Sequence, residues 1–443
     1  MKILYISNST SGGGAPASLF NLVEGARRGN QVAVVMPQAH GALYEKLQDK
    51  GVTLYTEMPY VLDIWPRSLN PFRLIYKYAM LWRNRHQVRE YIGRIIDEFK
   101  PDIIHTNVGP LAIGFKEATR RGIPHVWHMR EYQDKDFGMT FFPSKSAFKQ
   151  LLHTKGNYCI AITEDIFRHW ELDQEKDAII YNAIIKGSAP DRHTENPAGS
   201  NQTESLSNYA PELGNTCGIV PVASDSPCRY FLYAGRIEKP KGLMTLLKAF
   251  SKYRKNGGEN HLLVAGRPCG LYAVLCKAYV RLSGLTSCVD FLGQRNDVPA
   301  LMAQAEAFIM SSYSEGFGLT TAEAMLNGCV VIGRDTAGTK EQFDRGEEIT
   351  RQTIWQENKQ TATIENPGNP HVSENCQRCE IGLRFENVDQ LAAQLEYVSD
   401  KANASHLQQI RENAYKVVTT EYTAERYVSQ IIEFYKRVLC QKA

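Results

Sequence analysis

Two glutamates flank a glycine-rich turn in the stretch Glu315-Gly-Phe-Gly-Leu-Thr-Thr-Ala-Glu323. Such a turn lets the backbone approach a ligand closely, and the helix expected from Leu319 to Asn327 offers free N–H groups to an anion. Glu315 before the turn and Glu323 within the helix can accept hydrogen bonds from hydroxyl groups of a sugar and a ribose. The pattern predicts a site for a nucleotide-sugar. Because two glutamates at this spacing are usually accidental, the surrounding elements must decide.

The elements around this turn place it at the edge of a sheet. Ala307 to Ser311 is an apolar run typical of a buried strand, the turn follows it, and Gly328 ends the expected helix. A second glycine loop, Asp335-Thr-Ala-Gly338, follows the next apolar run, Val330 to Ile332. Since parallel strands end at one edge of a sheet, this context favours a binding site over an accidental pattern.

Two series of short apolar runs, separated by segments of mixed polarity, predict two parallel sheets with helices between the strands. The first series comprises Ile3 to Ser7, Gln31 to Met36, Ile103 to His105, His125 to His128 and Tyr158 to Ile162. The second comprises Tyr230 to Ala234, His261 to Ala265, Val289 to Leu292, Ala307 to Ser311 and Val330 to Ile332. The expected fold class is α/β, with two Rossmann-like, doubly wound domains that face a central cleft.

The boundary between these domains is expected in residues 187–228, which are rich in Ser, Asn, Pro, Gly and Thr and show no regular period. This stretch is interpreted as a linker or flexible insertion between an N-terminal domain, 1–186, and a C-terminal domain, 229–421. Within the second domain, 349–380 is polar and predicts an irregular excursion. Residues 422–443 carry apolar residues at helical spacing and predict a terminal helix that packs back on the N-terminal domain.

Length, composition and charge narrow the class of protein. A chain of 443 residues exceeds what one core usually fills, and 43% hydrophobic and 22% charged residues are typical of a globular protein. The formal charge of +3 is too small to imply a nucleic-acid partner. The apolar run within Met1 to Asn8 is too short for the hydrophobic region of a secretory leader. No apolar run in the sequence is long enough to span a membrane. Because the ten cysteines are scattered, we expect reduced thiols and a cytoplasmic location.

Taken together and in this order, the motifs resemble those of the retaining glycosyltransferases of the GT-B group, family 4, also called glycosyl transferases group 1. The resemblance covers nearly the whole chain. The loop Gly235-Arg-Ile-Glu-Lys-Pro-Lys-Gly242 matches the G-R-x4-K-G loop of that family. The resemblance implies that Arg236 and Lys241 bind the donor diphosphate, where two cations beside a helix start can neutralise the leaving group without a metal. A solvated basic loop is the alternative interpretation.

The resemblance implies further donor contacts. Val289-Asp-Phe-Leu-Gly293 is similar to the strand beside the nucleotide base in the family, and Gly266 follows the preceding strand at the same edge. Glu315 is expected to hold the donor sugar. The other predicted donor-binding residues are Gly316, Phe317, Gly318, Leu319, Glu323, Phe291, Leu292 and Gly266. Taken alone, Phe291 and Leu292 are more often plain core residues.

The first domain carries the acceptor-side candidates. Ser11-Gly-Gly-Gly-Ala-Pro-Ala-Ser lacks the spacing of a dinucleotide-binding turn, which disfavours a nicotinamide cofactor. In the family the equivalent loop faces the acceptor and the donor phosphate, so Gly13 and Gly14 are candidates, and an ordinary strand-helix turn fits them equally well. Pro124 to Glu131 resembles the family's active-site strand. His128 is therefore predicted to contact the sugar, with Arg130 or Glu131 orienting it or meeting the acceptor.

The activity implied by the resemblance is transfer of a sugar from a nucleoside diphosphate donor, with a UDP-sugar favoured, to a hydroxyl acceptor with retention of configuration. This is a hexosyltransferase of class EC 2.4, and polysaccharide or glycolipid assembly at the inner membrane face is its expected setting. The predicted catalytic residues are His128, Glu315, Arg236 and Lys241. The alternatives are an epimerase or phosphorylase of the same fold, and a non-catalytic subunit that binds nucleotide-sugars.

Two further segments have open interpretations. Residues 67–100 combine Lys and Arg with Leu, Ile, Tyr and Trp, as in a basic amphipathic helix that lies on anionic lipid. A solvated helix with one face in the core fits this segment equally well. Cys376-Gln-Arg-Cys379 with His371 has residue types that bind zinc, and a second ligand pair is missing, so we expect no metal and no other cofactor. Asn182 is similar to a family position near the domain boundary, for which a structural role is predicted.

Overall fold

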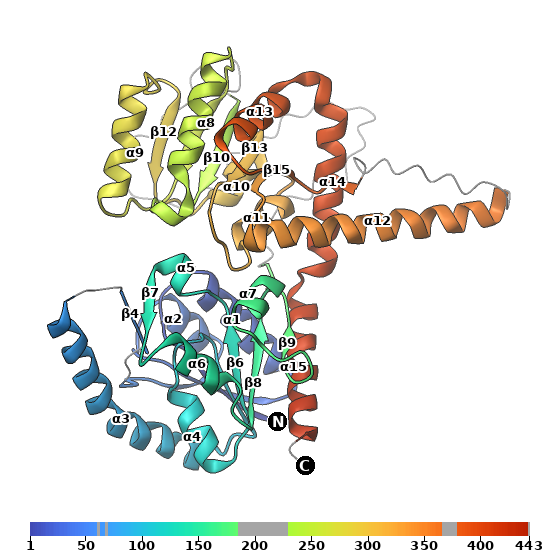
Figure 1. The fold of residues 1–443 in the computed structure, drawn as a ribbon. Coiled ribbons are helices and arrows are strands. Elements are labelled where there is room, and N and C mark those ends of the chain that lie inside the picture. The colour runs from blue at the N-terminus through green and yellow to red at the C-terminus, as the bar shows by residue number, and fades with distance from the viewer. Residues whose placement is uncertain (60–62, 67–69, 185–228, 366–378, 442–443) are drawn as a thin grey trace.

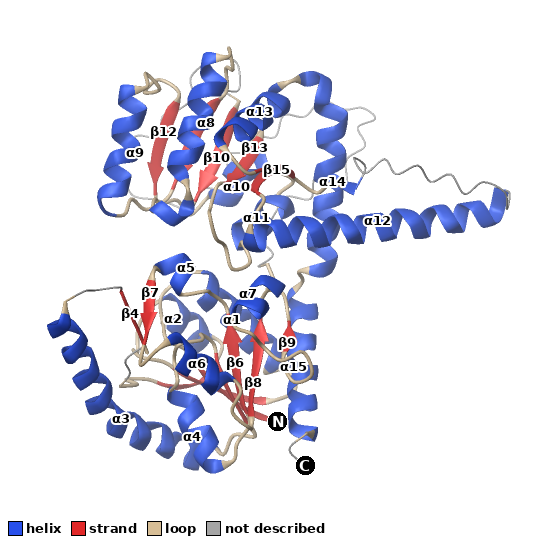
Figure 2. Ribbon diagram, viewed as in Figure 1, coloured by secondary structure: helices blue, strands red, loops and turns tan. Residues whose placement is uncertain are grey.

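The computed structural model describes residues 1–59, 63–66, 70–184, 229–365 and 379–441. Two α/β bodies stand one above the other in Figure 1, and each contains a parallel sheet flanked by helices (Figure 2). The predicted fold class of two Rossmann-like domains is therefore confirmed. The linker predicted at 187–228 lies outside the described residues.

The N-terminal sheet has seven parallel strands. Their order is β3 (Thr53–Tyr55), β2 (Gln31–Val35), β1 (Lys2–Ile6), β5 (Ile103–Thr106), β6 (His125–Met129), β8 (Asn157–Ala161) and β9 (Ala178–Ile179). Alternate residues of β1 enter different cores, because side chains alternate between the faces of a strand. Ile3 and Tyr5 pack on one face, and Leu4 and Ile6 pack on the other. Burial on both faces explains why the strands are continuous apolar runs.

Among the described residues, seven helices from the first part of the chain surround this sheet. They are α1 (Gly14–Ala26), α2 (Ala42–Asp49), α3 (Pro71–Phe99), α4 (Ile113–Arg121), α5 (Asp134–Phe137), α6 (Lys145–Leu152) and α7 (Glu164–His169). A short antiparallel pair, β4 (Ile64–Pro66) and β7 (Met139–Phe141), lies beside them. Helix α1 begins at Gly14, so Gly14 belongs to the first turn of α1.

The C-terminal sheet has six parallel strands, in the order β12 (Val289–Gly293), β11 (His261–Ala265), β10 (Tyr230–Ala234), β13 (Ala307–Met310), β14 (Val330–Arg334) and β15 (Leu383–Phe385). The helices around it are α8 (Leu243–Lys255), α9 (Gly270–Leu282), α10 (Val298–Gln304), α11 (Leu319–Leu326), α12 (Ala337–Glu365), α13 (Val388–Ser399) and α14 (Ala404–Glu421). The apolar runs of the second series coincide with β10 to β14 to within two residues.

The predicted irregular excursion at 349–380 is wrong for its first half. Residues 349–365 continue α12, which extends away from the domain in Figure 1. Because this segment is polar, it shows no apolar stripe, and its Gln, Glu, Arg and Lys residues favour a helix without one. Residues 366–378 lie outside the described part of the chain.

The last helix, α15 (Ala424–Cys440), runs back along the N-terminal domain in Figure 1. Its buried face consists of Tyr427, Ile431, Phe434, Tyr435 and Val438, which belong to the same core as Ile3 and Tyr5 of β1. Helix α1 comes so close that a Cβ atom on Gly25 would lie 2.5 Å from Cγ2 of Val428. The C-terminal end of the chain therefore completes the N-terminal domain.

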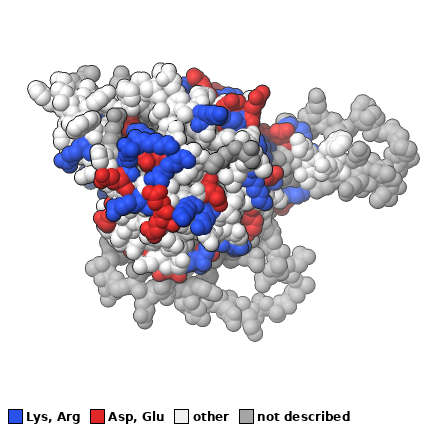
Figure 3. Space-filling view, turned by 90° about the horizontal axis from the view of Figure 1, so that it is seen from below, with Lys and Arg blue, Asp and Glu red and all other residues white. Residues whose placement is uncertain are grey.

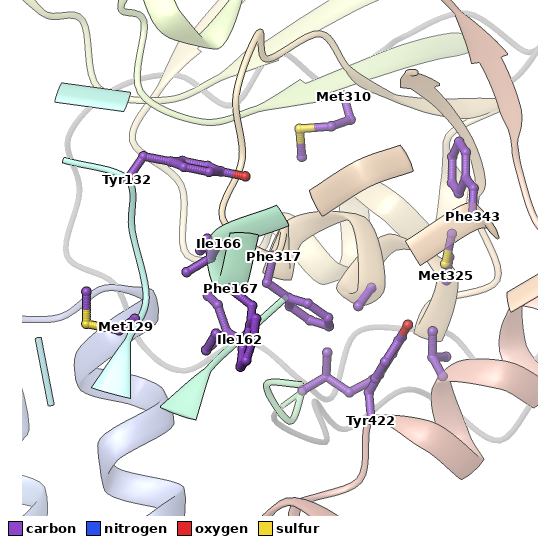
Figure 4. Packing of buried hydrophobic residues seen from close by; sticks show 14 of the residues in the cluster. Met129, Tyr132, Ile162, Ile166, Phe167, Met310, Phe317, Met325, Phe343 and Tyr422 are labelled. Carbon is purple, nitrogen blue, oxygen red and sulfur yellow. The ribbon is translucent and has the colours of Figure 1, made fainter. Parts of the chain in front are cut away.

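An apolar cluster joins the two domains, and Phe317 lies within it (Figure 4). The Phe317 ring contacts the Tyr422 ring edge-on, with centroids 5.0 Å apart, and lies near Ile162 and Ile166 of the N-terminal domain. Beside this cluster, the Glu341 carboxylate accepts hydrogen bonds from the backbone N–H groups of Glu164, at 2.6 Å, and Asp165, at 3.1 Å. Apolar packing and this helix cap fix the domains relative to one another.

Strand order determines where a ligand can bind. In the N-terminal sheet the chain runs outward from β1 in one direction and from β5 in the other, and β10 and β13 form the same kind of switch in the C-terminal sheet. Loops that leave the carboxyl ends of strands at such a point diverge and open a crevice. The loops after β1, β10 and β13 begin at these points and contain Gly13, Arg236 and Glu315.

Candidate functional site

A cavity of about 440 Å³ lies between the two domains at these strand ends. Both domains contribute to its lining. The predicted site residues that line it are Gly13, Gly14, Arg130, Glu131, Arg236, Lys241, Glu315, Gly316, Phe317, Gly318 and Leu319. Residues from opposite ends of the chain thus meet around one space, as the sequence motifs predicted.

Lys241 and Glu315 form an ion pair at the C-terminal side of the cavity. The Lys241 Nζ atom lies 2.5 Å from Oε1 of Glu315, and the hydroxyl of Ser312 donates to the same oxygen at 2.7 Å. Gly242 holds the lysine loop against β13, because a Cβ atom there would lie 2.0 Å from the carbonyl oxygen of Ser311. Its φ of 70° also lies in the region that glycine tolerates best. The pair is preformed and faces the ligand space.

Arg236 spans the cavity toward the other domain. Its guanidinium lies 3.0 Å from the Glu238 carboxylate and 5.5 Å from the ring centroid of Phe137 in α5. About half of the Arg236 side chain is exposed, so a ligand can reach its remaining donors. Arg236 and Lys241 therefore offer two cations at one end of the cavity.

Two helices begin at this cavity with no side-chain cap on their first N–H groups. Gly318 precedes α11 with a φ of 84°, and Gly13 precedes α1 with a φ of 138°. The two helix starts face each other, because a Cβ atom on Gly14 would lie 2.9 Å from Cδ1 of Leu319. Free N–H groups and the positive ends of two helix dipoles favour an anionic ligand here.

Two carboxyl groups of the N-terminal domain face this cationic side. Burial raises the pKa of Glu131 to about 7, and the Asp136 carboxylate beside it adds to the rise. Burial likewise raises the pKa of Asp136, while its backbone hydrogen bonds and Lys241 oppose the rise. The Glu131 carboxylate accepts a hydrogen bond from the side chain of Gln133 at 2.6 Å. Both groups can bind hydroxyls of an acceptor.

His128 is fully buried and is not among the residues that line the cavity. Its Nδ1 lies 3.3 Å from Nε2 of His105, and its ring packs 6.2 Å from the Tyr427 ring of α15. Burial lowers the pKa of His128 well below its usual range, so the imidazole is neutral. In this structure His128 does not line the cavity, and its predicted contact with the sugar stays a prediction. Arg130, two residues further along, lines the cavity instead.

Four other predicted donor residues also lie outside the cavity lining. Glu323 lies one turn further along α11 than Leu319, and burial raises the pKa of Glu323 to about 7. Phe291 and Leu292 pack at the edge of cores from β12. Gly266 allows its backbone to pack closely against the loop that carries Arg236 and Lys241. A Cβ atom on Gly266 would lie 1.8 Å from the carbonyl oxygen of Gly235, where that loop begins.

Matches to known families agree with this geometry. Residues 219–366 match the family described as glycosyl transferases group 1, and residues 12–169 match the glycosyl transferase 4-like domain. The chain belongs to the group 1 glycosyltransferases. The two matched segments carry most of the two walls of the cavity, from Gly13 to Ile162 on one side and from Tyr233 to Thr320 on the other, and Asn182 lines it from outside both segments.

Curated relatives of this group 1 chain act on glycolipids according to their names. The lipopolysaccharide core mannosyltransferase LpcC of Rhizobium leguminosarum is 26% identical over 50% of this chain and 62% of its own length. The GDP-mannose:cellobiosyl-diphosphopolyprenol α-mannosyltransferase of Xanthomonas oryzae is 32% identical over 25% of this chain and 30% of its own length. The matched segments thus span less than two thirds of these relatives.

Solved structures share the fold over almost the whole chain. Alr3699/HepE of Anabaena, in complex with UDP, has a TM-score of 0.67 at 16% identity and covers 99% of this chain and 100% of its own. WaaG, a glycosyltransferase of lipopolysaccharide biosynthesis, has a TM-score of 0.57 at 16% identity and covers 97% and 99% of the two chains. These likenesses establish the GT-B fold of the group 1 chain. Among the described residues, no helix is long and apolar enough to cross a membrane.

Several residues of the site were not predicted as such. Asp136 and Phe137 line the cavity from the four-residue helix α5, and Asn182 lines it although a structural role was predicted. The positive φ of Gln133, 66°, turns the chain so that Asp136 returns to the cavity, and no sequence signal announces it. Two of the three residues that were considered for a zinc site, Cys376 and His371, lie outside the described residues.

Proposed function

We propose that this chain transfers a hexosyl group from a nucleoside diphosphate sugar to a hydroxyl of a glycan or lipid-linked acceptor, with retention of configuration. One observation supports this proposal most strongly. Arg236, the ion pair of Lys241 with Glu315, and the uncapped start of α11 all lie around one cavity. Polysaccharide or glycolipid assembly is the proposed setting, in keeping with the printed names of the curated relatives.

In this proposal the residues divide the work between binding and charge stabilisation. Arg236, Lys241 and the first N–H groups of α11 stabilise the diphosphate as it departs, and the Glu315 carboxylate accepts bonds from sugar hydroxyls. Lys241 also neutralises Glu315 before the donor arrives. Retention follows from the family resemblance, in which the departing phosphate receives the acceptor proton on the same face of the sugar. No separate protein base is therefore assigned.

A donor screen tests the proposal. Purified protein is incubated with UDP-, GDP- and ADP-sugars, and released nucleotide is measured with and without a glycan acceptor. The sequence favours a UDP-sugar, and one relative's name specifies GDP-mannose, so UDP-glucose and GDP-mannose are compared first. Because two protein cations supply the charge, turnover is expected to survive EDTA. Tight nucleotide binding without turnover of any donor would instead identify a non-catalytic binding subunit.

A pH effect on ribonucleoside binding is expected from Glu323. We propose that its carboxylate accepts hydrogen bonds from the two ribose hydroxyls, which requires the ionised form. With a pKa of about 7 in the free protein, affinity for uridine or guanosine should rise as pH increases from 6 to 8, by up to about tenfold per pH unit below the pKa. Calorimetry at several pH values measures the slope, and Glu323→Gln should abolish it.

Glu131 provides the matched control, because its pKa is also about 7 and it lines the opposite side of the cavity. Glu131→Gln should keep the pH dependence of nucleoside binding. A Glu323→Gln protein with the wild-type slope would show that Glu323 does not bind the ribose. A 2′,3′-dideoxynucleoside, which lacks both hydroxyls, should show no slope with the wild-type protein.

Helix α3 presents an unpartnered apolar face that suits a membrane surface. Lys77 is buried with its Nζ 4.8 Å from the ring centroid of Trp65, and the opposite side of the helix exposes 78% of Phe72, 66% of Ile75 and 75% of Trp82. The exposed Arg73 lies one helical turn before Lys77. In Figure 3 the Lys and Arg side chains of the underside are mixed with Asp and Glu, so the exposed apolar residues are what distinguishes the α3 surface.

We propose that this face of α3 lies on an anionic bilayer and brings the cleft to a lipid-linked acceptor. Phe72→Ser with Trp82→Ser should weaken co-sedimentation with vesicles of phosphatidylglycerol and phosphatidylcholine by about tenfold or more. The control is Leu271→Ser with Leu282→Ser in α9, which removes equally exposed apolar side chains from the other domain. Equal vesicle binding by all three proteins would exclude the α3 surface as the membrane contact. Dimers that form without vesicles and are lost in the α3 variant would instead show that this face binds a second copy of the chain.

A further inference from the structure

Arg130 is a buried cation whose hydrogen-bond partners are all neutral. Only 4% of the residue is exposed, and Nε donates to the Asn107 side-chain oxygen at 3.0 Å. Nη1 donates to the Asn182 side-chain oxygen at 2.6 Å, and Nη2 donates to the Tyr427 hydroxyl at 2.8 Å. In the part of the chain that the structure describes, no carboxylate forms an ion pair with this guanidinium. A buried charge without a counter-ion is costly, so its presence requires an explanation.

The histidines behind Arg130 supply no negative charge. His128 Nδ1 accepts at 3.3 Å from Nη2 of Arg130, and His105 Nε2 lies 3.3 Å from the same nitrogen of His128. Both imidazoles are fully buried, and both are neutral because burial lowers their pKa values well below the usual range. The Glu131 carboxylate acts on Arg130 without forming an ion pair, and burial raises the pKa of Glu131 to about 7, so the described residues compensate the charge of Arg130 only in part.

This charge borders the cavity. Arg130 lines the space together with Gly13 and Gly14 at the uncapped start of α1, and Arg236 and Lys241 line it from the other domain. A guanidinium with a remaining N–H donor and a free helix start both favour a phosphate oxygen. Four positive elements thus line the cavity, two from each domain.

We propose that Arg130 is a phosphate-binding group of the N-terminal domain and that Tyr427 of α15 positions it. The proposal rests on the proposed function and deepens it, because the expected ligand is a phosphate or diphosphate dianion. That anion can be the diphosphate of the donor or the phosphate of a lipid-linked acceptor. Tyr427 lies 297 positions from Arg130 in the chain, so the last helix contributes to a site that the family motifs do not include.

The first experiment removes the charge of Arg130. Arg130→Gln should weaken binding of UDP, GDP and inorganic diphosphate in calorimetry by about 10- to 100-fold if the donor diphosphate is the ligand. If the acceptor phosphate is the ligand, those affinities should hold while binding of geranyl diphosphate falls by a similar factor. Unchanged binding of all four probes would overturn the proposal. Wild-type protein that binds no nucleotide would instead contradict the proposed function.

The second experiment tests positioning by Tyr427. Tyr427→Phe removes only the hydroxyl that accepts from Arg130, and it should weaken the same probe by about 3- to 10-fold while Arg130 remains charged. Tyr435→Phe is the matched control, because Tyr435 lies on the same face of α15 and hydrogen-bonds to His105 at 2.6 Å. Both variants lose one buried hydrogen bond, so their thermal unfolding midpoints should fall alike.

The comparison between these variants decides the role of Tyr427. A loss of probe affinity in Tyr427→Phe that exceeds the loss in Tyr435→Phe supports positioning. Tyr427→Phe in the Arg130→Gln background should cause no further loss, because the residue that it positions is gone. Equal losses in the two single variants, or additive losses in the double variant, would show that Tyr427 only stabilises the packing of α15.

Discussion

Lys241→Ala should weaken binding of a nucleoside diphosphate by about 10- to 100-fold while leaving nucleoside binding unchanged, and lower kcat by about 10²- to 10³-fold. The reason is the position of the ammonium group, 2.5 Å from Glu315 at the cavity wall beside the start of α11. Its loss removes a cation from the leaving group and leaves the Glu315 carboxylate without its ion-pair partner. Calorimetry with UDP, GDP and the two nucleosides measures the binding effect.

Lys252→Ala is the control for this change. Lys252 also belongs to the C-terminal domain and also has a carboxylate partner, Asp389, and it lies outside the cavity lining. This variant should keep wild-type affinity for nucleotides. If Lys241→Ala weakened nucleoside and nucleoside diphosphate binding equally, the phosphate role of Lys241 would be wrong, and a general disturbance of the C-terminal domain would explain the loss.

Gly316→Ala should reduce kcat/KM by about 100-fold with little loss of stability, because a small displacement between reacting groups is enough for such an effect. A Cβ atom at this position would lie 2.5 Å from the carbonyl oxygen of Arg130 in the other domain. Neither backbone segment can shift by itself, since Arg130 directly follows strand β6 and Gly316 lies in the turn between β13 and α11. The domains must therefore move apart to make room for the methyl group.

Because Gly316 lies at the domain interface, its substitution should affect catalysis more than nucleotide binding. Nucleoside diphosphate binding should fall less than kcat/KM, because Arg236 and Lys241 remain in place on their own domain. Gly29→Ala is the control, as a Cβ atom on Gly29 would have no neighbour within 4 Å and no left-handed φ is required there. Wild-type kinetics for Gly316→Ala would mean that the domains approach each other differently during turnover.

Local patterns in the sequence determined most of the sheet structure. Strands such as Tyr230–Ala234 and His261–Ala265 were predicted with their observed bounds, because a strand buried on both faces is a continuous apolar run. The start of α11 at Leu319 was also predicted, since glycine before a helix and glycine after it mark its ends. The C-terminal wall of the cavity follows from these elements, and it was therefore readable from sequence.

The N-terminal wall was predicted less well. In a strand buried on both faces, the apolar pattern cannot tell which side chains border a cavity, and His128 was predicted to contact the sugar while Arg130 or Glu131 oriented it or met the acceptor. The surroundings of both side chains depend on α15, whose Tyr427 packs beside His128 and accepts a hydrogen bond from Arg130. Phe317 was a similar case, because its ring packs in the apolar contact between the domains although the residue also lines the cavity.

What the sequence alone determined about this protein is the set of local elements and the family motifs at their ends. Which polar groups share a space depended on the tertiary structure. Asp136 and Tyr427 carry no motif, and only a structural role was predicted for Asn182. These three residues reach the site through an unusual backbone turn, a returning terminal helix and a domain boundary, respectively. The physical reason is that strand and helix periods are local, whereas the neutral partners of a buried arginine can come from any part of the chain.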